Sequence, residues 1–296
     1  MNTTDAGETT LWCATVRDKS FEERIEAAQA GGFPAMSMFP IDYHTYTNAG
    51  LSTEEMHELM TESGVDVTVL DPFTKWLPKW EPPDDMSEED LAFADFDENE
   101  FFEMGAALDV DSINLVEPFG NEISIDAAAE SFGRVCDRAA KHDWRVHLEF
   151  MPVSGIPDLE TAWAIVKQAD RSNGGILFDS WHYFRGTPDH DLLRSIPGDQ
   201  IFHVQLADAA AEVQGSLYND LLHYRRLPGE GDFNLPTVIG ILDDIGGLDS
   251  VGVELFSDRF DELDPETAGK RSGESLQTVL GDVEASDNKH SSNESP

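Results

Sequence analysis

Cysteine is scarce in this chain. Its 296 residues include only Cys13 and Cys136, and neither lies in a CxxC motif. Two cysteines cannot supply the set of disulfides that stabilises small secreted domains. We therefore expect two free, buried thiols and a reducing compartment.

Long apolar segments are missing as well. No run of about 18 apolar residues occurs, which is the length that a membrane-spanning helix needs. The first residues lack the basic and apolar stretches of a secretion signal. The sequence thus predicts a soluble, cytoplasmic protein with no membrane partner.

Basic residues are few compared with acidic ones. The chain has 19 Lys and Arg against 59 Asp and Glu, and its net charge is −40. Such a charge repels nucleic acids and anionic membranes, so we exclude nucleic acid as a partner. The acidic residues are spread along the chain, which is typical of a halophilic protein whose self-repulsion is screened by a salt-rich cytoplasm. The alternative, an acidic interaction surface, would require clustered charges.

Short apolar runs alternate with helical segments along the whole chain. For example, the strand expected at 35–39 is followed by a helix at 51–63 and another strand at 65–71. Eight such strand–helix pairs predict an α/β fold with a parallel sheet, and the length suits a (β/α)8 TIM barrel. We expect the first strand at 9–16, and an irregular loop directly after residue 39.

The barrel is predicted to be a single domain over residues 9–284. Residues 1–8 are polar, and residues 285–296 combine Ser, Asn, Asp and Glu with little apolar content. We expect both segments, the N-terminus and the acidic tail, to be disordered.

Polar residues end four consecutive apolar runs in the second half of the chain. They are Glu149, Asp179, Gln205 and Glu254. Because the carboxyl ends of parallel barrel strands share one mouth, we expect these side chains to converge. Carboxylate and amide oxygens suit hard or borderline divalent ions such as Mg²⁺ or Mn²⁺. The sequence therefore predicts a divalent metal site.

Each of these residues also has a structural interpretation. Glu149 could form a buried ion pair, but the shortage of Lys and Arg favours a metal ligand. A buried glutamine is usually just hydrogen-bonded. His203 shares a strand face with Gln205, and we choose Gln205 because it lies closer to the carboxyl end of the strand.

Residues near these strand ends are candidate substrate contacts. His182 follows Asp179 as D-x-x-H, a spacing that places both at the rim. Arg225 and Arg226 precede a Pro-Gly-Glu-Gly turn, and either could enter the mouth to bind a hydroxyl, carboxylate or phosphate. The alternative is a surface arginine pair beside an ordinary turn.

The loop at 72–83 is rich in aromatic residues and proline. It is either an irregular surface loop or a wall of the substrate site, because βα loops build the active face of a barrel. Trp76 is our candidate substrate contact in this loop.

Two glutamates beside a metal suit chemistry next to a carbonyl group. A divalent ion that bridges a carbonyl and the adjacent hydroxyl acidifies the proton between them and stabilises the enediolate. Glu149 and Glu254 would then act as the acid–base pair. Returning the proton gives isomerisation or epimerisation, whereas loss of a β-hydroxyl gives dehydration.

Taken together, these motifs resemble the xylose isomerase-like TIM barrel superfamily, and more narrowly its sugar phosphate isomerase/epimerase branch. That branch includes ketose 3-epimerases, hydroxypyruvate isomerase, inosose dehydratase and 3-dehydroshikimate dehydratase. The motifs are His-Leu-Glu149-Phe, Asp179-Ser-Trp-His182, His203-Val-Gln205-Leu-Ala-Asp208, Arg226-Leu-Pro-Gly-Glu-Gly-Asp232 and Val253-Glu254.

The resemblance implies a role for each motif. It implies Glu149, Asp179, Gln205 and Glu254 as metal ligands, with Glu149 and Glu254 also the acid–base pair. It implies His182 and Arg226 as substrate contacts. Many members carry His where this chain has Gln205, and Gln at that place resembles hydroxypyruvate isomerase and some dehydroshikimate dehydratases. Endonuclease IV relatives use a histidine-rich zinc cluster that this acidic chain lacks.

The predicted function is a metal-dependent isomerase or epimerase of a small polyhydroxy carbonyl compound. We expect Mn²⁺, Mg²⁺ or Co²⁺ as cofactor and a small-molecule substrate, and a homo-oligomer is possible. The first alternative is a metal-dependent dehydratase of a cyclic polyol ketone or a dehydroshikimate-like acid. The second is a non-catalytic, sugar-binding barrel.

Overall fold

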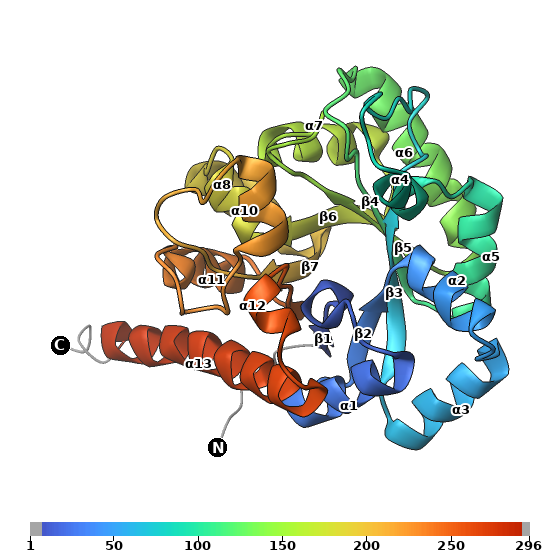
Figure 1. Ribbon diagram of the computed structural model, residues 1–296. Coiled ribbons are helices and arrows are strands. Elements are labelled where there is room, and N and C mark those ends of the chain that lie inside the picture. Colours follow the sequence, from blue (N-terminus) through green and yellow to red (C-terminus); the bar gives the residue numbers. More distant parts are fainter. Residues whose placement is uncertain (1–7, 292–296) are drawn as a thin grey trace.

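Eight parallel strands form a closed barrel in the computed structural model, which describes residues 8–291 (Figure 1). Each strand pairs with the next one in the chain, and β8 pairs with β1 to close the ring. This confirms the predicted TIM barrel. The strands are β1 (Glu8–Leu11), β2 (Ala35–Met38), β3 (Asp66–Phe73), β4 (Ser112–Leu115), β5 (Arg145–Glu149), β6 (Gly174–Asp179), β7 (Ile201–Leu206) and β8 (Ser250–Val253).

Helices surround the ring of strands (Figure 1). They are α1 (Phe21–Gly31), α2 (Pro40–Asn48), α3 (Thr53–Ser63), α4 (Glu88–Ala94), α5 (Glu98–Leu108), α6 (Ile125–Ala139), α7 (Leu159–Ala169), α8 (Ser180–Arg185), α9 (His190–Ser195), α10 (Leu217–His223), α11 (Leu235–Asp244), α12 (Asp258–Asp261) and α13 (Pro265–Ser291). Short 3-10 helices occupy Cys13–Val16, Ala140–His142 and Gly198–Gln200.

The main core lies between the helices and the outer faces of the strands. Along α6, Phe132, Val135 and Ala139 are buried at three- and four-residue spacing, as expected for a helix with one apolar face. Along β5, Val146 and Leu148 belong to the same core. The alternate residues of β5 face the inside of the barrel, and the last of these is Glu149.

Two expected elements near the N-terminus were wrong. The strand expected at 9–16 ends at Leu11, and Cys13–Val16 is a 3-10 helix because the chain turns over the end of β8. The hydroxyl of Thr15 donates to the Val253 carbonyl at 3.0 Å. The loop expected after residue 39 is instead α2, whose sequence lacks a clear apolar period and which is held by tertiary contacts such as the Arg24–Asp42 pair.

The C-terminal helix α13 lies beside the first helix, α1 (Figure 1). The two helices approach closely because glycine lies at the contact. A side-chain carbon added at Gly269 would lie 1.8 Å from the Ala27 carbonyl oxygen, and one at Gly273 would lie 2.1 Å from the Gly31 carbonyl oxygen. Helix α13 thereby joins the end of the barrel to its beginning.

The expected boundaries of the barrel fall close to those of the described elements. Glu8, which we assigned to the disordered N-terminus, begins β1, and residues 1–7 lie outside the described residues. Helix α13 runs to Ser291, so the boundary that we placed at 284 falls inside it. Residues 292–296 of the expected acidic tail also lie outside the described residues.

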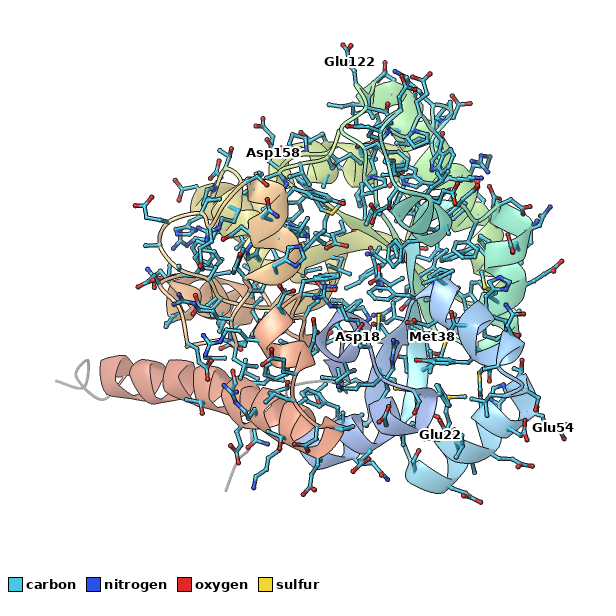
Figure 2. All side chains as sticks on the ribbon, in the orientation of Figure 1. Asp18, Glu22, Met38, Glu54, Glu122 and Asp158 are labelled. Atoms are coloured by element: carbon cyan, nitrogen blue, oxygen red, sulfur yellow. The ribbon has the colours of Figure 1, made fainter. Side chains whose placement is uncertain are left out.

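Other properties of the described residues bear on the sequence analysis. Cys13 and Cys136 are both free and buried, as predicted. Within residues 8–291, no helix combines the length and apolar character needed to cross a bilayer. Acidic side chains point outward at the periphery, as Glu22, Glu54 and Glu122 illustrate (Figure 2).

Candidate active site and metal centre

The four polar strand ends meet at one rim of the barrel. Glu149 and Asp179 are the last residues of β5 and β6, Gln205 lies near the end of β7, and Glu254 directly follows β8. All four are at most 5% exposed. The strand register places Asp179 beside Gln205, and the Gln205 Nε2 donates to Glu254 Oε1 at 3.0 Å.

His182 completes a compact group with Glu149 and Asp179. One ligand atom from each of the three lies within 4.8 Å of the other two. His182 Nε2 is 3.2 Å from Glu149 Oε1 and 3.6 Å from Asp179 Oδ2. We expected His182 to contact the substrate, and the structure places it among the candidate metal ligands.

The position of His182 follows from the D-x-x-H spacing. Asp179 caps the N-terminus of α8, where its Oδ1 accepts from the backbone N–H groups of Trp181 at 2.6 Å and His182 at 3.1 Å. The cap satisfies donors that a helix start leaves free, and it fixes the first turn of α8 on the rim. His182 in that turn is therefore held above the Asp179 carboxylate.

Arg225 extends its side chain into the rim. It is 2% exposed, and its Nη1 donates to Asp179 Oδ2 at 2.7 Å and to Glu254 Oε2 at 3.0 Å. Its Nη2 lies 3.5 Å from His182 Nε2. The guanidinium also packs over the ring of Trp181, 5.1 Å from its centroid.

The neighbouring Arg226 does not reach the rim. Its backbone pairs with Asp208, and its side chain is partly exposed, with a long contact of 3.4 Å to the Glu230 carbonyl. Adjacent residues of an extended segment point to opposite sides. The structure thus gives Arg225, not Arg226, the position at the rim.

Trp76 lies away from the site. It is 0% exposed, its indole N–H donates to the Val116 carbonyl at 2.8 Å, and its ring packs near Phe132 of α6. A side chain enclosed in this way cannot form a wall of the substrate site. The same loop carries Trp80, which is partly exposed and packs against Phe119.

Asp71 and Asn114 belong to the site and were not among our candidates. Asn114 of β4 donates through Nδ2 to Asp71 Oδ1 at 2.7 Å and to Glu149 Oε2 at 2.6 Å. Asp71 ends an apolar run, the same signal that identified Asp179, so it could have been found. Asn114 lies within a strand and carries no comparable signal.

Burial and neighbouring charges raise the pKa of some carboxyl groups at the rim and lower the pKa of another. Burial, assisted by the charge of Glu149, raises the pKa of Asp71 to about 8. Burial also raises the pKa of Glu254 well above its usual range, although Arg225 opposes it. Burial acts in the same direction on Asp179, but Arg225 and His182 outweigh it and lower the pKa of that group. The site thus holds proton donors and a fixed negative charge together.

The residues of the rim fit a divalent metal ion. The rim holds four buried carboxyl groups, Asp71, Glu149, Asp179 and Glu254, and Arg225 donates to two of them, Asp179 and Glu254. The Oε1 atom of Gln205 is buried and has no hydrogen-bond partner within the described structure. Surplus negative charge and a free amide oxygen are what a hard or borderline cation requires.

Comparison with known proteins identifies the family. Residues 25–279 match the family model described as xylose isomerase-like TIM barrel. This chain belongs to that family. The resemblance to this superfamily inferred from the motifs is therefore confirmed.

Three relatives illustrate the range of the family. A 3-dehydroshikimate dehydratase of Pseudomonas putida is 25% identical over 244 residues, which are 80% of this chain and 36% of the relative. An inosose isomerase of Bacillus velezensis is 29% identical over 156 residues, which are 52% of this chain and 55% of the relative. The crystal structure of the IOLI protein with a bound zinc atom superposes with a TM-score of 0.78 at 19% identity, covering 93% of this chain and 99% of that protein.

Two of these relatives are named as enzymes, a dehydratase and an isomerase, so their reactions differ. The chain spans about a third of the dehydratase and about half of the inosose isomerase. The similarity to the zinc-containing structure shows the shared fold.

Proposed function

We propose that this protein is a divalent-metal-dependent isomerase or epimerase of a small polyhydroxy carbonyl compound. The observation that carries the proposal is the placement of Glu149 and Glu254. They enter one rim from β5 and β8, with the candidate ligands Asp179 and His182 between them. Two carboxyl groups that reach a substrate from different sides can remove a proton from one carbon and deliver one to another position.

The metal would be held by Glu149, Asp179 and His182, with Gln205 and Glu254 as further oxygen donors. When bound, such an ion polarises the carbonyl of the substrate. The oxygen-rich set supports Mn²⁺ or Mg²⁺, and the imidazole nitrogen also suits Co²⁺ or Zn²⁺. Zinc is the ion in the IOLI relative.

The protein residues supply the proton transfers. Glu149, whose Oε2 is oriented by Asn114, takes the proton from the carbon next to the carbonyl, and the electron pair of that C–H bond moves towards the carbonyl oxygen. Burial raises the pKa of Glu254, which favours this residue as the group that delivers a proton to the neighbouring carbon or to the opposite face. Arg225 can bind a substrate oxygen, as a rigid cationic donor does.

A dehydratase is the second candidate, and two observations favour it. The match to the 3-dehydroshikimate dehydratase spans 80% of this chain, against 52% for the inosose isomerase. In addition, Asp71 has a pKa of about 8 and could protonate a departing hydroxyl after Glu149 has removed the proton. Both candidates share the same first step and differ in the fate of the β-hydroxyl.

A substrate screen in high salt separates these reactions. The chelator-treated protein would be supplied with Mn²⁺, Mg²⁺, Co²⁺ or Zn²⁺ and tested on ketoses, inosose, hydroxypyruvate and dehydroshikimate. Incorporation of solvent deuterium without loss of water identifies an isomerase or epimerase. A new conjugated-enone absorbance identifies a dehydratase, and binding without turnover in every arm identifies a sugar-binding barrel.

Glu149→Gln and Glu254→Gln test the acid–base pair on whichever substrate turns over. Each variant should lower kcat by about a hundredfold or more, because general acid–base catalysis contributes at least that much. Glu160→Gln, at an exposed position of α7, is the matched control and should leave kcat unchanged. Full turnover by either rim variant, with a native circular dichroism spectrum, would refute the proposed roles.

A further inference from the structure

Outside the metal rim, a cavity lies between the loop that follows β7 and the loop that follows β8. Its volume is about 380 Å³. Four arginines line it: Arg225 and Arg226 from the first loop, Arg259 from α12 and Arg271 from α13. Further polar residues of the lining are His223, Glu230, Gln214 and Ser257.

This concentration of arginine is unusual for so acidic a chain. Nine of its twelve arginines have a carboxylate oxygen within 4.0 Å in the described structure. Arg226 and Arg259 have none among the described residues, although acidic residues outnumber basic ones about threefold. The third arginine without such a pair, Arg145, lies over the ring of Phe202 instead. Two unpaired guanidinium groups therefore share one cavity.

Glu230, the acidic residue of the lining, and Asp258, the partner of His223, are already engaged. Glu230 pairs with Arg271 at 2.9 Å, and Asp258 pairs with His223 at 2.8 Å. These pairs leave the positive charge of Arg226 and Arg259 uncompensated. Like charges held near each other are unfavourable, and a bound anion relieves the repulsion.

The position in the fold points to the same class of ligand. In TIM barrels the loops after the seventh and eighth strands frequently form a phosphate site. Guanidinium groups match the geometry of phosphate oxygens and bind them through paired N–H donors. A cavity of this size and lining accommodates a phosphate group.

We propose that this cavity binds a phosphate dianion, either free or as a monoester, through Arg226 and Arg259 with support from Arg271. The site lies beside the metal rim. Arg225, which lines the cavity and donates to Asp179 and Glu254, forms the wall between the two. Bridges from Tyr224 to Ser257 and from Asp208 to Arg226 hold this wall in place. The proposal stands whether or not the proposed reaction is correct.

Titration calorimetry on the full chain tests the proposal. The metal-free protein would be titrated with inorganic phosphate and, in a second arm, with glycerol 3-phosphate, at constant ionic strength. We expect saturable binding to one site in at least one arm, and the arm with the lower Kd identifies the source of the phosphate. Arg226→Gln and Arg259→Gln should each raise Kd about tenfold or more, because each removes charge-assisted hydrogen bonds.

Two further variants test whether phosphate binding depends on this cavity and not on surface charge or the metal rim. Arg194→Gln, at an exposed arginine of α9, should leave Kd unchanged. Glu149→Gln alters the metal rim and should also leave Kd unchanged. The proposal is overturned if neither phosphate binds more tightly than chloride, if Arg194→Gln weakens binding as much as Arg259→Gln, or if Glu149→Gln abolishes binding.

Discussion

Arg225 and Arg226 are neighbours in the chain, but the structure gives them different surroundings. Both line the arginine-rich cavity. Arg225 is buried and donates to Asp179 and Glu254, whereas Arg226 is partly exposed and has no carboxylate partner among the described residues. The sequence leaves open which of them enters the mouth, and the resemblance implied Arg226. Which arginine enters the rim depends on the direction of the extended segment that carries both. Bridges to Asp208 and Ser257 set this direction.

The pair provides a matched test at the level of single residues. Arg225→Gln should lower kcat/KM by about a hundredfold or more, because it removes a charged substrate contact and leaves two buried carboxylates without their cation. On a substrate without a phosphate group, Arg226→Gln should change kcat/KM by less than about twofold. Kinetics at saturating metal, with thermal unfolding as a check on folding, measure both. Equal losses in the two variants would contradict the assignment.

The residues of the candidate site could be predicted to different degrees. Glu149, Asp179, Gln205 and Glu254 each end an apolar run, so the alternation of the chain was sufficient to bring them together. Asn114 could not be found in this way, because its role depends on the neighbouring strand β3. Trp76 was misjudged because aromatic composition does not tell whether a loop packs inward or outward.

At the level of elements, the contact between α1 and α13 is the most sensitive to side-chain size. Gly269→Ala should destabilise the fold by several kcal/mol, because its methyl group would overlap the Ala27 carbonyl and push the helices apart. Gly281→Ala is the control, since nothing lies within 4 Å of a carbon added there. That change should be neutral or stabilise α13 by about 0.5–1 kcal/mol. The free energy of unfolding of both variants would be measured with denaturant. A loss in Gly269→Ala alone indicates a tight helix contact, whereas equal losses would indicate a general effect of replacing glycine.

Buried histidines inside the barrel make its stability depend on pH. His203 of β7 shares a 2.8 Å hydrogen bond with the Ser250 hydroxyl of β8, and its ring lies 4.5 Å from that of His147 of β5. Burial, together with the charge of Arg145, lowers the pKa of His203 to about 3. The folded barrel therefore keeps this imidazole neutral where the unfolded chain would protonate it.

The stability of the barrel should consequently fall in acid. For His203 the folded pKa lies below the unfolded value of about 6.5, so its contribution is fully present above pH 6.5 and is lost as pH falls towards 3. The expected loss from this one group is about 1.4 kcal/mol per pH unit in that window. Buried carboxyl groups with a raised pKa act in the opposite direction. The test therefore compares the pH dependence of the unfolding free energy between the wild-type protein and a His203 variant. His203→Gln should flatten the pH dependence of the unfolding free energy, and an unchanged slope would contradict the prediction.

At the level of the whole molecule, charge is the dominant property. The net charge of −40 is carried by acidic side chains that extend outward around the barrel (Figure 2). Self-repulsion between them is screened over about 10 Å at 0.1 M salt and about 3 Å at 1 M. We propose that the chain is adapted to a salt-rich environment.

Thermal unfolding in increasing KCl tests this adaptation. The Tm should rise between 0.1 M and 2 M KCl, and a gain of about 2 kcal/mol would correspond to roughly 3 °C. Potassium glutamate at equal ionic strength is the control, and it should give a similar rise if screening is the cause. A Tm that does not depend on salt would contradict the proposal.

The overall fold was the most predictable feature, because eight alternating units leave few arrangements for a parallel sheet. Local geometry was less predictable. Cys13–Val16 is apolar and β-rich like a strand, yet its position over the end of β8 turns it into a 3-10 helix. Helix α2 likewise depends on distant partners such as Arg24, which no local pattern reveals.

The joining of the last helix to the first has a consequence for synthesis. Strand β1 needs β8 as its neighbour, and α1 needs α13, so the ring cannot close until the C-terminal quarter has left the ribosome. Until then, β1 and the most recently made strand present open edges to other nascent chains. Mutual repulsion between such strongly anionic, half-finished barrels opposes their aggregation during this interval.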